Sequence, residues 1–177
     1  MPAWLLRVGE LDERLLHAVL ARRRPPMDAL VRGLTRLGDA SVSIAMALIL
    51  LAGVVPGLQD AGKTAAFSLA FSHLLVQILK RSFVRPRPFL PIGIRSLIKA
   101  PDRFSFPSGH AAAALSISLA VALSIPSPEA YLFLGLGLGV GVTRCYLGVH
   151  YPGDVLAGWG LAIFSTFLAG PVLALLP

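Results

Sequence analysis

The chain has 177 residues and a net charge of +7, yet only 14% of its residues are charged and its mean hydropathy is +0.74. Soluble domains carry roughly 25% charged residues, so this composition favours a lipid bilayer around most of a single domain. The apolar content and the lack of a nucleic-acid-binding motif argue against a nucleic-acid partner, and the single cysteine, Cys145, excludes an intrachain disulfide.

The first predicted element lies in the N-terminal region, where apolar residues recur at helical spacing and arginines fall off or beyond that stripe. This pattern predicts an amphipathic helix on the membrane surface, with an ordinary cytosolic helix pair as the alternative. Pro25 and Pro26 end this helix, and Asp28 is expected to cap a second short one. The apolar stripe consists of Leu11, Leu15, Leu16, Val19 and Leu20.

Five apolar segments follow, each about long enough to cross a hydrocarbon core of ~30 Å if the bilayer thins around the shorter ones. They predict an all-α fold, a polytopic membrane helical bundle with about five transmembrane helices in residues 41–177. Residues 1–40 would form amphipathic helices at the membrane interface. The apolar segments are 41–58, 61–79, 108–125, 130–147 and 154–176.

An odd number of crossings places the N-terminal region, the long connection 81–107 and the region 144–153 on one side of the membrane. All Lys and Arg residues except Lys63 fall on that side. The positive-inside rule makes it the cytoplasmic face of the cell membrane. Cations that bind a substrate add to the same count, so the opposite orientation stays open.

Lys80 and Arg87 form the first of three short motifs on this face. Two cations at this spacing can converge on one anion if the chain folds back after the second membrane segment. The alternative is a basic flank of a membrane helix, which requires no ligand.

The second motif, Pro107-Ser108-Gly109-His110, opens the third membrane segment. Ser108 is predicted to cap the helix, and Gly109 lets an anion approach the backbone closely. With the helix dipole, this helix start is a natural phosphate cradle, and His110 lies in its first turn. The alternative is a capped helix with an incidental histidine.

The third motif contains Arg144, His150 and Asp154, where the fourth segment ends and the fifth begins. A carboxylate near His150 can fix its tautomer and raise its basicity, whereas the alternative is an N-terminal helix cap beside a surface histidine. Together the three motifs supply what phosphoryl transfer needs: fixed positive charge, a nucleophile and an acid for the leaving group.

The patterns Lys-x6-Arg-Pro, Pro-Ser-Gly-His and Arg-x5-His-x3-Asp resemble the signature of the type 2 phosphatidic acid phosphatase superfamily, over about residues 41–176. The resemblance implies that His150 attacks phosphorus to form a phosphohistidine and that Asp154 orients it. His110 would protonate the leaving oxygen and then activate water. One departure is Thr143 before Arg144, where the family commonly has serine. The resemblance implies no metal and no other cofactor, with the phosphoryl oxygens held by Lys80, Arg87, Ser108, Gly109 and Arg144.

A site at the bilayer boundary can receive a lipid whose tail stays in the membrane. The compact architecture resembles the subgroup that acts on polyisoprenoid phosphates and diphosphates, which we favour as substrates. Phosphatidic acid and phosphatidylglycerol phosphate are the alternatives.

Two further hypotheses are a vanadate-dependent peroxidase, against which the membrane segments count, and a non-catalytic lipid-phosphate binder or transporter. The presence of both histidines and the acid of the motifs argues against the second. Inside the second segment, His73 and Gln77 are predicted to hydrogen-bond to another helix rather than to contact substrate. The sequence leaves the oligomeric state open.

Overall fold

The computed structural model describes residues 3–175, with their side chains from residue 9 onward. Leu176, the predicted end of the fifth apolar segment, and the first two residues of the predicted surface region lie outside this range. Apart from one isolated β-bridge between Pro86 and Phe104, the regular structure of the described residues is helical. The helices are α1 (Ala3–Ala21), α2 (Pro25–Thr35), the short 3₁₀ helix η1 (Arg36–Gly38), α3 (Ala40–Leu51), α4 (Gln59–Phe83), α5 (Gly109–Ser124), α6 (Ala130–Tyr146) and α7 (Pro152–Leu173).

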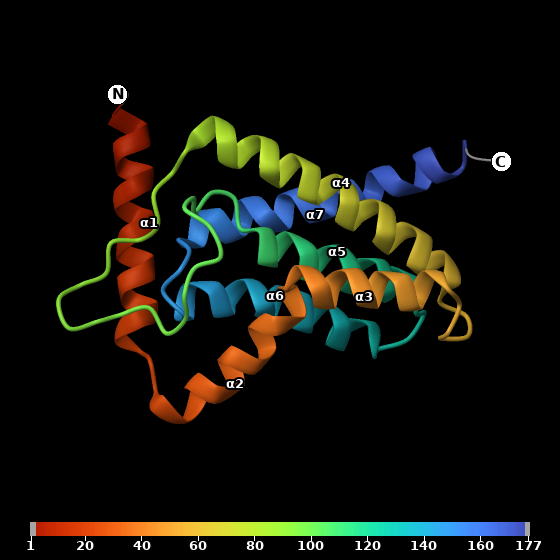
Figure 1. Cartoon of the computed structure of the whole chain (residues 1–177), viewed down its shortest axis with the longest axis horizontal. Helices are drawn as coiled ribbons and strands as arrows, with labels where there is room; N and C mark the ends of the chain where they lie inside the picture. Colours follow the sequence, from red (N-terminus) through yellow and green to blue (C-terminus); the bar gives the residue numbers. More distant parts are fainter. Residues whose placement is uncertain (1–2, 176–177) are drawn as a thin grey trace.

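Helices α3 to α7 run lengthwise beside one another, whereas α1 crosses one end of this bundle at a steep angle and α2 leads back to it (Figure 1). Helix α5 is central, because it contacts α3, α4, α6 and α7. Near its start is the run 111–114, four buried alanines whose small side chains allow neighbouring helices to approach closely. The all-helical prediction is confirmed.

Three predicted helix boundaries were wrong. Helix α3 ends at Leu51 rather than near residue 58, because Gly53 and Gly57 adopt left-handed backbone conformations that turn the chain toward α4. Helix α4 continues past Lys80 to Phe83, so this lysine lies inside the last turns of the helix and not at its end.

At the N-terminus, α2 begins at Pro25 with Arg24 as its N-cap, so Asp28 is not the cap that the sequence suggested. A proline suits the first helical position because its fixed φ is already helical and its missing N–H is not needed there. Asp28 lies in the first turn, where its carboxylate accepts a hydrogen bond of 2.8 Å from the Tyr146 hydroxyl.

Close packing at two glycines brings the predicted motifs together. A Cβ atom at Gly158 of α7 would lie 2.5 Å from the carbonyl oxygen of Ser108, and one at Gly38 would lie 2.8 Å from that of His110. Both positions therefore exclude larger side chains. As a result, α7 and η1 press against the start of α5 from two sides.

Helix α1 is attached to the same end of the bundle. Leu16 and Leu20 are buried in a cluster with Ala111 and Cys145, which belong to α5 and α6. Beyond the helix, the Arg23 guanidinium donates hydrogen bonds of 2.6 Å and 2.8 Å to the carbonyls of residues 146 and 95. The C-terminal half of the apolar stripe is thus buried on the helix ends that carry the second and third motifs, whereas Leu11 and Leu15 stay exposed.

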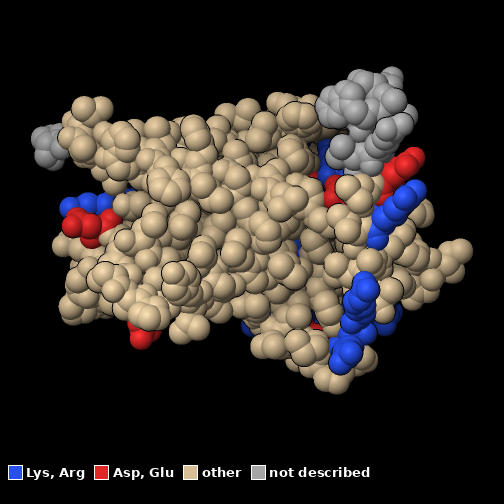
Figure 2. All heavy atoms as spheres, turned by 180° about the vertical axis from the view of Figure 1, so that it is seen from behind, with Lys and Arg blue, Asp and Glu red and all other residues tan. Residues whose placement is uncertain are grey.

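The surface of the bundle suits a lipid environment. Charged side chains gather toward its two ends, and a broad uncharged band separates them (Figure 2). Helices α4 and α7 are long and apolar enough to span a membrane, and α2 with α3 would form a third span bent by 57°. Helices α5 and α6 are apolar but shorter, with 16 and 17 residues. These features support a membrane protein with two to three clear spans by length and composition.

Candidate active site

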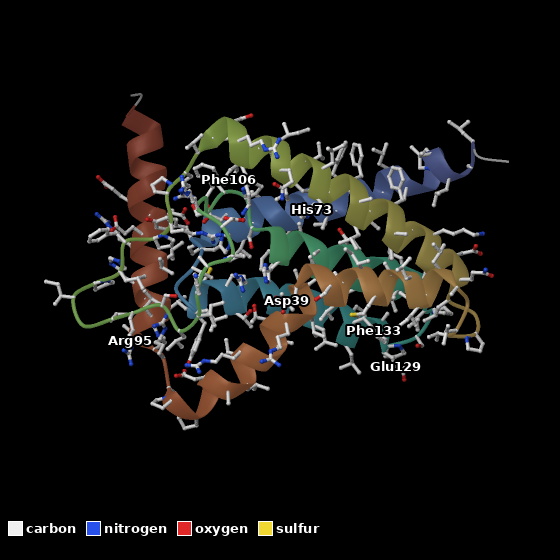
Figure 3. All side chains as sticks on the ribbon, in the orientation of Figure 1. Asp39, His73, Arg95, Phe106, Glu129 and Phe133 are labelled. Carbon is white, nitrogen blue, oxygen red and sulfur yellow. The ribbon has the colours of Figure 1, made fainter. Side chains whose placement is uncertain are left out.

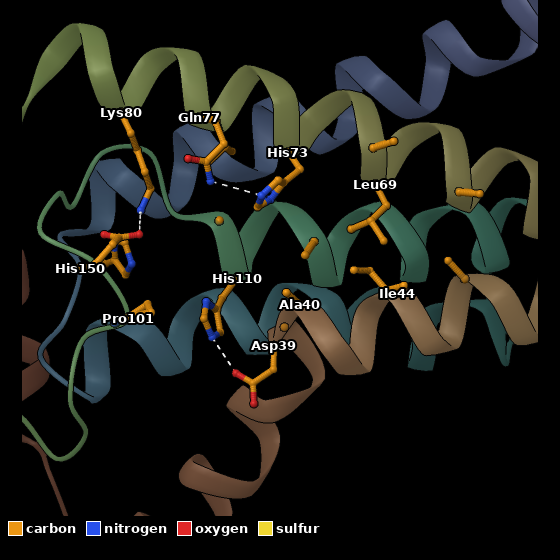
Figure 4. Close-up of a pocket in the computed structure, with 18 of the residues that line it drawn as sticks. Asp39, Ala40, Ile44, Leu69, His73, Gln77, Lys80, Pro101, His110 and His150 are labelled. Carbon is orange, nitrogen blue, oxygen red and sulfur yellow. Dashed lines mark hydrogen bonds and ion pairs between the residues drawn. The ribbon is translucent and has the colours of Figure 1, made fainter.

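The residues of the three predicted motifs lie at the end of the bundle crossed by α1. Polar side chains crowd this end, whereas Glu129 and Phe133 mark the opposite one (Figure 3). A cavity of about 570 Å³ opens there between α3, α4 and α5. Its lining includes Lys80, Gly109, His110 and His150 of the predicted site, together with Asp39 and Asp102 (Figure 4).

His150 follows α6 in the short connection to α7, and its side chain is only 1% exposed. Its Nε2 atom lies 2.7 Å from Nη1 of Arg87. Because a guanidinium only donates hydrogen bonds, Nε2 must accept, which assigns the ring proton to Nδ1. Nδ1 faces Oδ2 of Asp154 at 3.5 Å, longer than a normal hydrogen bond. Burial, followed by the charges of Arg87 and Arg144, lowers the pKa of His150 well below its ordinary value.

The Asp154 carboxylate, which is fully buried, is fixed directly by groups from two segments and indirectly by a third. Oδ2 accepts the backbone N–H of Tyr151 at 2.9 Å, and Oδ1 accepts Nη1 of Arg85 at 2.7 Å. The other arm of Arg85 donates to Asp12 of α1 at 2.7 Å, and Asp12 also accepts the N–H of Gly153 at 2.7 Å. Burial alone would lower the pKa of Arg85, but Asp154 and Asp12 outweigh it and raise that pKa. The acid beside His150 is therefore held from the N-terminal helix.

Lys80 and Arg87 do converge, as the first motif predicted. The chain folds back after α4 because Val84 adopts a left-handed conformation with φ 48°. The Asp102 carboxylate bridges the two cations, accepting Lys80 Nζ at 2.5 Å and Arg87 Nη2 at 2.6 Å. Burial would raise the pKa of Asp102, but hydrogen bonds and charge from Lys80 and Arg87 lower it. This carboxylate shows that the pair can grip one anionic group.

Arg144 is the cation of the site that points most directly to an anionic ligand. Its side chain is almost completely buried, and Nη1 donates to the Thr35 hydroxyl at 2.8 Å. Its Nε and Nη2 atoms are also buried but have no hydrogen-bond partner among the described residues. Leaving two donors of a buried charge unpaired is costly, and two adjacent guanidinium donors match two oxygens of a phosphate.

The start of α5 is only partly the cradle that the sequence suggested. Ser108 is the N-cap, and its hydroxyl accepts the N–H of Ala111 at 3.4 Å. Its own backbone N–H, however, donates to the carbonyl of Asp154 at 2.9 Å, so this group holds α7 and not an anion. Gly109 faces the cavity, where the first N–H groups of the helix lack helical partners.

His110 lies on the opposite wall of the cavity from Lys80 and His150 (Figure 4). Its Nε2 atom is 2.9 Å from Oδ1 of Asp39, the residue between η1 and α3. A carboxylate accepts here, so the proton lies on Nε2 and the Nδ1 atom is left for a ligand.

Sequence reasoning missed four polar residues of this site: Asp12, Asp39, Arg85 and Asp102. Arg85 and Asp102 stand in the long charged connection after α4, and nothing in the sequence pattern separated them from its other charges. Asp12 and Asp39 precede the membrane segments and have no motif spacing. Among residues 3–175, no group of three or more His, Cys, Asp or Glu side chains is placed to hold a metal ion.

The model of the family described as the PAP2 superfamily matches residues 61–173, which include all three motifs. The chain belongs to the PAP2 superfamily. Its PAP2 relatives include phosphatidylglycerophosphatase B of Bacillus subtilis, 31% identical over 173 residues that cover 91% of this chain and 82% of that protein. The undecaprenyl-diphosphatase of Sulfolobus acidocaldarius is 32% identical over 144 residues, or 81% of this chain and 69% of that protein.

The fold is also that of a solved PAP2 structure. A transmembrane PAP2-type phosphatidylglycerolphosphate phosphatase from Bacillus subtilis matches with a TM-score of 0.76 and 28% identity, covering 97% of this chain and 88% of that one. The predicted family and the predicted enzyme class, a phosphatase of the membrane, are confirmed.

Proposed function

We propose that this PAP2 protein hydrolyses the terminal phosphate of a lipid phosphate or diphosphate through a phosphohistidine intermediate. The observation that carries this proposal is the pair of unpartnered, buried donors on Arg144, next to two further cations and a histidine whose ring accepts at Nε2. A phosphoryl group bound by Arg144, Lys80 and Arg87 would satisfy these donors. The three cations would also supply the positive charge that stabilises the phosphoryl oxygens during transfer. The hydroxyl of Ser108 and the helix start at Gly109 complete the binding groups.

In the first step, the lone pair on Nε2 of His150 attacks phosphorus, and Arg87 moves its hydrogen bond from this nitrogen to a phosphoryl oxygen. The Asp154 carboxylate, which faces the proton on Nδ1, stabilises the positive charge that the ring gains. The bond from phosphorus to the lipid oxygen breaks as His110, which enters the step as the imidazolium, donates its Nδ1 proton to that oxygen and becomes neutral. The product is a phosphohistidine and a lipid alcohol, or a lipid monophosphate from a diphosphate.

In the second step, the neutral His110 accepts a proton from water, and the resulting hydroxide attacks the phosphohistidine. The bond between nitrogen and phosphorus breaks, inorganic phosphate leaves, and His150 regains its lone pair. The cations of the site provide the charge stabilisation throughout, so the proposed reaction needs no divalent metal.

The cavity supports a lipid as the substrate. Beyond the polar end it is lined by apolar residues of α3 and α4, including Ile44, Leu48 and Leu69, the first two of which are about half exposed. An apolar wall of this kind accommodates a hydrocarbon tail. We favour a polyisoprenoid chain, in line with the undecaprenyl-diphosphatase relative. The alternatives are phosphatidylglycerol phosphate, which the phosphatidylglycerophosphatase relative supports, and phosphatidic acid.

The proposed membrane arrangement has five crossings, made by α3 to α7 in a core of residues 41–177, with the bilayer thinned around the shorter helices. Residues 1–40 would lie on the surface, which agrees with the steep angle of α1 to the bundle (Figure 1). The positive-inside rule places the site at the cytoplasmic face of the cell membrane. An Ile92→Cys substitution in the exposed loop tests this orientation. If a membrane-impermeant thiol reagent labels this cysteine in intact cells, the site lies at the opposite, external face.

Purified protein incubated without divalent metal and with chelator should release phosphate from at least one member of a lipid panel. The panel contains isoprenoid mono- and diphosphates, phosphatidic acid and phosphatidylglycerol phosphate. With substrate carrying labelled terminal phosphate, rapid quenching at alkaline pH should trap an acid-labile phosphoprotein that the His150→Ala variant does not form. Binding of these lipids without any phosphate release would instead make the protein a lipid-phosphate binder.

A further inference from the structure

The cavity wall contains two polar side chains that the reaction above does not use. His73 and Gln77 lie on α4, and their Nε2 atoms are 3.2 Å apart. The sequence predicted that this pair bonds to another helix, but the bond joins two residues one turn apart in the same helix. Both side chains line the cavity that contains the proposed catalytic residues (Figure 4).

Their distance from the phosphate site follows from helix geometry. Lys80, Gln77 and His73 are three and seven residues apart, so they lie on one face of α4. At a rise of 1.5 Å per residue, Gln77 is about 4.5 Å and His73 about 10 Å deeper along the helix than Lys80. Further along the same wall come Ala70, Leu69 and Ala66, which are apolar. The polar pair therefore stands between the phosphate-binding end and the apolar end.

The pair also has hydrogen-bonding capacity left. The bond between the two side chains involves one imidazole nitrogen and one amide nitrogen, and within the described residues no other hydrogen bond of either side chain is formed. The second imidazole nitrogen, the second amide N–H and the amide oxygen remain for a ligand. Polar groups inside a membrane segment are costly, and they tend to mark the path of a substrate.

We propose that His73 and Gln77 form a subsite for an oxygen-bearing spacer between the terminal phosphate and the hydrocarbon tail of the substrate. This inference rests on the proposed function, because Lys80 must hold the terminal phosphoryl group. The subsite favours lipids with a second phosphate, or with a polyol and a phosphodiester, over lipids whose phosphate is joined directly to hydrocarbon. Gln77 is close enough for either spacer, whereas His73 is reached only by the longer one.

Three substrates separate these spacers: farnesyl monophosphate has none, farnesyl diphosphate has a short one, and phosphatidylglycerol phosphate has a long one. The wild-type protein and the Gln77→Leu and His73→Leu variants are compared by kcat/KM in the same lipid nanodiscs. Leu74→Ala is the matched control, since Leu74 neighbours His73 on α4 but is exposed away from the cavity lining.

Gln77→Leu should lower kcat/KM about tenfold for both spacer-bearing substrates, the effect expected for one lost hydrogen bond to a polar or charged group. His73→Leu should lower it about tenfold for phosphatidylglycerol phosphate alone. The change with farnesyl monophosphate should stay within about twofold. Leu74→Ala should leave the ranking of the three substrates as in the wild type.

Equal losses for all three substrates in both variants would overturn the subsite, because they would show that the pair only supports the fold. Unchanged kcat/KM values would overturn it too, because they would show that no substrate contacts the pair. A wild-type protein that releases phosphate from no member of the lipid panel overturns the proposed function itself, and with it the subsite, whereas activity on phosphatidic acid alone overturns only the subsite. The two failures are therefore distinguishable by the wild-type activity.

Discussion

The two histidines of the site stand in contrasting surroundings. The side chain of His150 is 1% exposed, and its acid partner Asp154 is tied to two further segments through Arg85. The side chain of His110 is 17% exposed, and its partner Asp39 is 44% exposed at the cavity mouth. One histidine is thus enclosed and fixed, and the other is partly exposed beside a partner that is more exposed still.

This difference agrees with the proposed division of labour. A nucleophile must be held in line with the bond it breaks, and it must be neutral, as the lowered pKa of His150 ensures at pH 7. An acid that later activates water must exchange protons with solvent between the two steps. Substitutions on the enclosed side of the site should therefore lower activity more than the corresponding substitutions on the open side.

The largest effect is expected for His150→Ala, which should abolish turnover because it removes the atom that bonds to phosphorus. Phosphate release from the best substrate of the lipid panel measures this, with the trapped phosphoprotein as a second readout. His17→Ala is the control, since His17 lies on α1 and faces Glu13 instead of the cavity. Substantial activity in His150→Ala would contradict a covalent mechanism through this residue.

His110→Ala should lower kcat by about 10²–10⁴-fold, the usual contribution of a general acid–base group. The variant should still be phosphorylated by an aryl phosphate, whose leaving group needs no proton, and the phosphoprotein should then accumulate because no base activates water. Single-turnover measurements with labelled phosphate separate the two steps. Normal decay of the phosphoprotein would show that another group activates the water.

The parts of the site that could be predicted are those with motif spacing at helix boundaries. Lys80, Arg87, Arg144, His150 and Asp154 were placed together from the sequence, because the parity of the membrane segments brings the three motifs to one face. The amphipathic character of the N-terminal helix and the apolar character of the later helices also followed from composition and periodicity. The boundaries of α3 and α4 did not, because local turns at Gly53 and Val84 decided them.

The supporting carboxylates could not be predicted, because their roles depend on tertiary packing. Asp12 is one polar residue on an amphipathic helix, and nothing in that helix shows that it is buried against Gly153 and Arg85. Likewise, Asp39 reaches His110 because Gly38 lets η1 press against α5. A single sequence carries no signal for contacts that join segments so far apart.

Asp12→Asn tests the residue that supports Asp154 through Arg85 on the enclosed side of the site. The amide can still accept the N–H of Gly153, but the charge that holds Arg85 on Asp154 is lost, so we expect kcat to fall about tenfold with little change in KM. Asp12→Glu should recover part of the loss, which a purely structural role would not predict. Glu13→Gln is the matched control on α1, since that side chain is half exposed and its one ion pair among the described residues is with His17.

The contribution of Asp12 to positioning should also appear without substrate. Nitrogen-15 NMR of the histidine rings reports whether the proton of His150 stays on Nδ1, and Asp12→Asn should broaden or shift this signal while Glu13→Gln leaves it in place. An unchanged ring signal together with a tenfold loss of kcat would mean that Asp12 acts elsewhere than through Arg85 and Asp154.

The smallest effect is expected on the open side, for Asp39→Asn. Exposed ion pairs contribute about 0.2–1 kcal/mol, so the loss of this carboxylate should lower kcat only about threefold for a lipid phosphate, whose leaving oxygen needs the proton of His110. For an aryl phosphate the formation of the phosphoprotein should be unaffected. A loss as large as that of Asp12→Asn, or equal losses with both leaving groups, would remove the distinction between a fixed nucleophile and a solvent-exchanging acid. Asp39 would then have to be treated as part of the binding geometry, and not as a partner that only assists proton transfer.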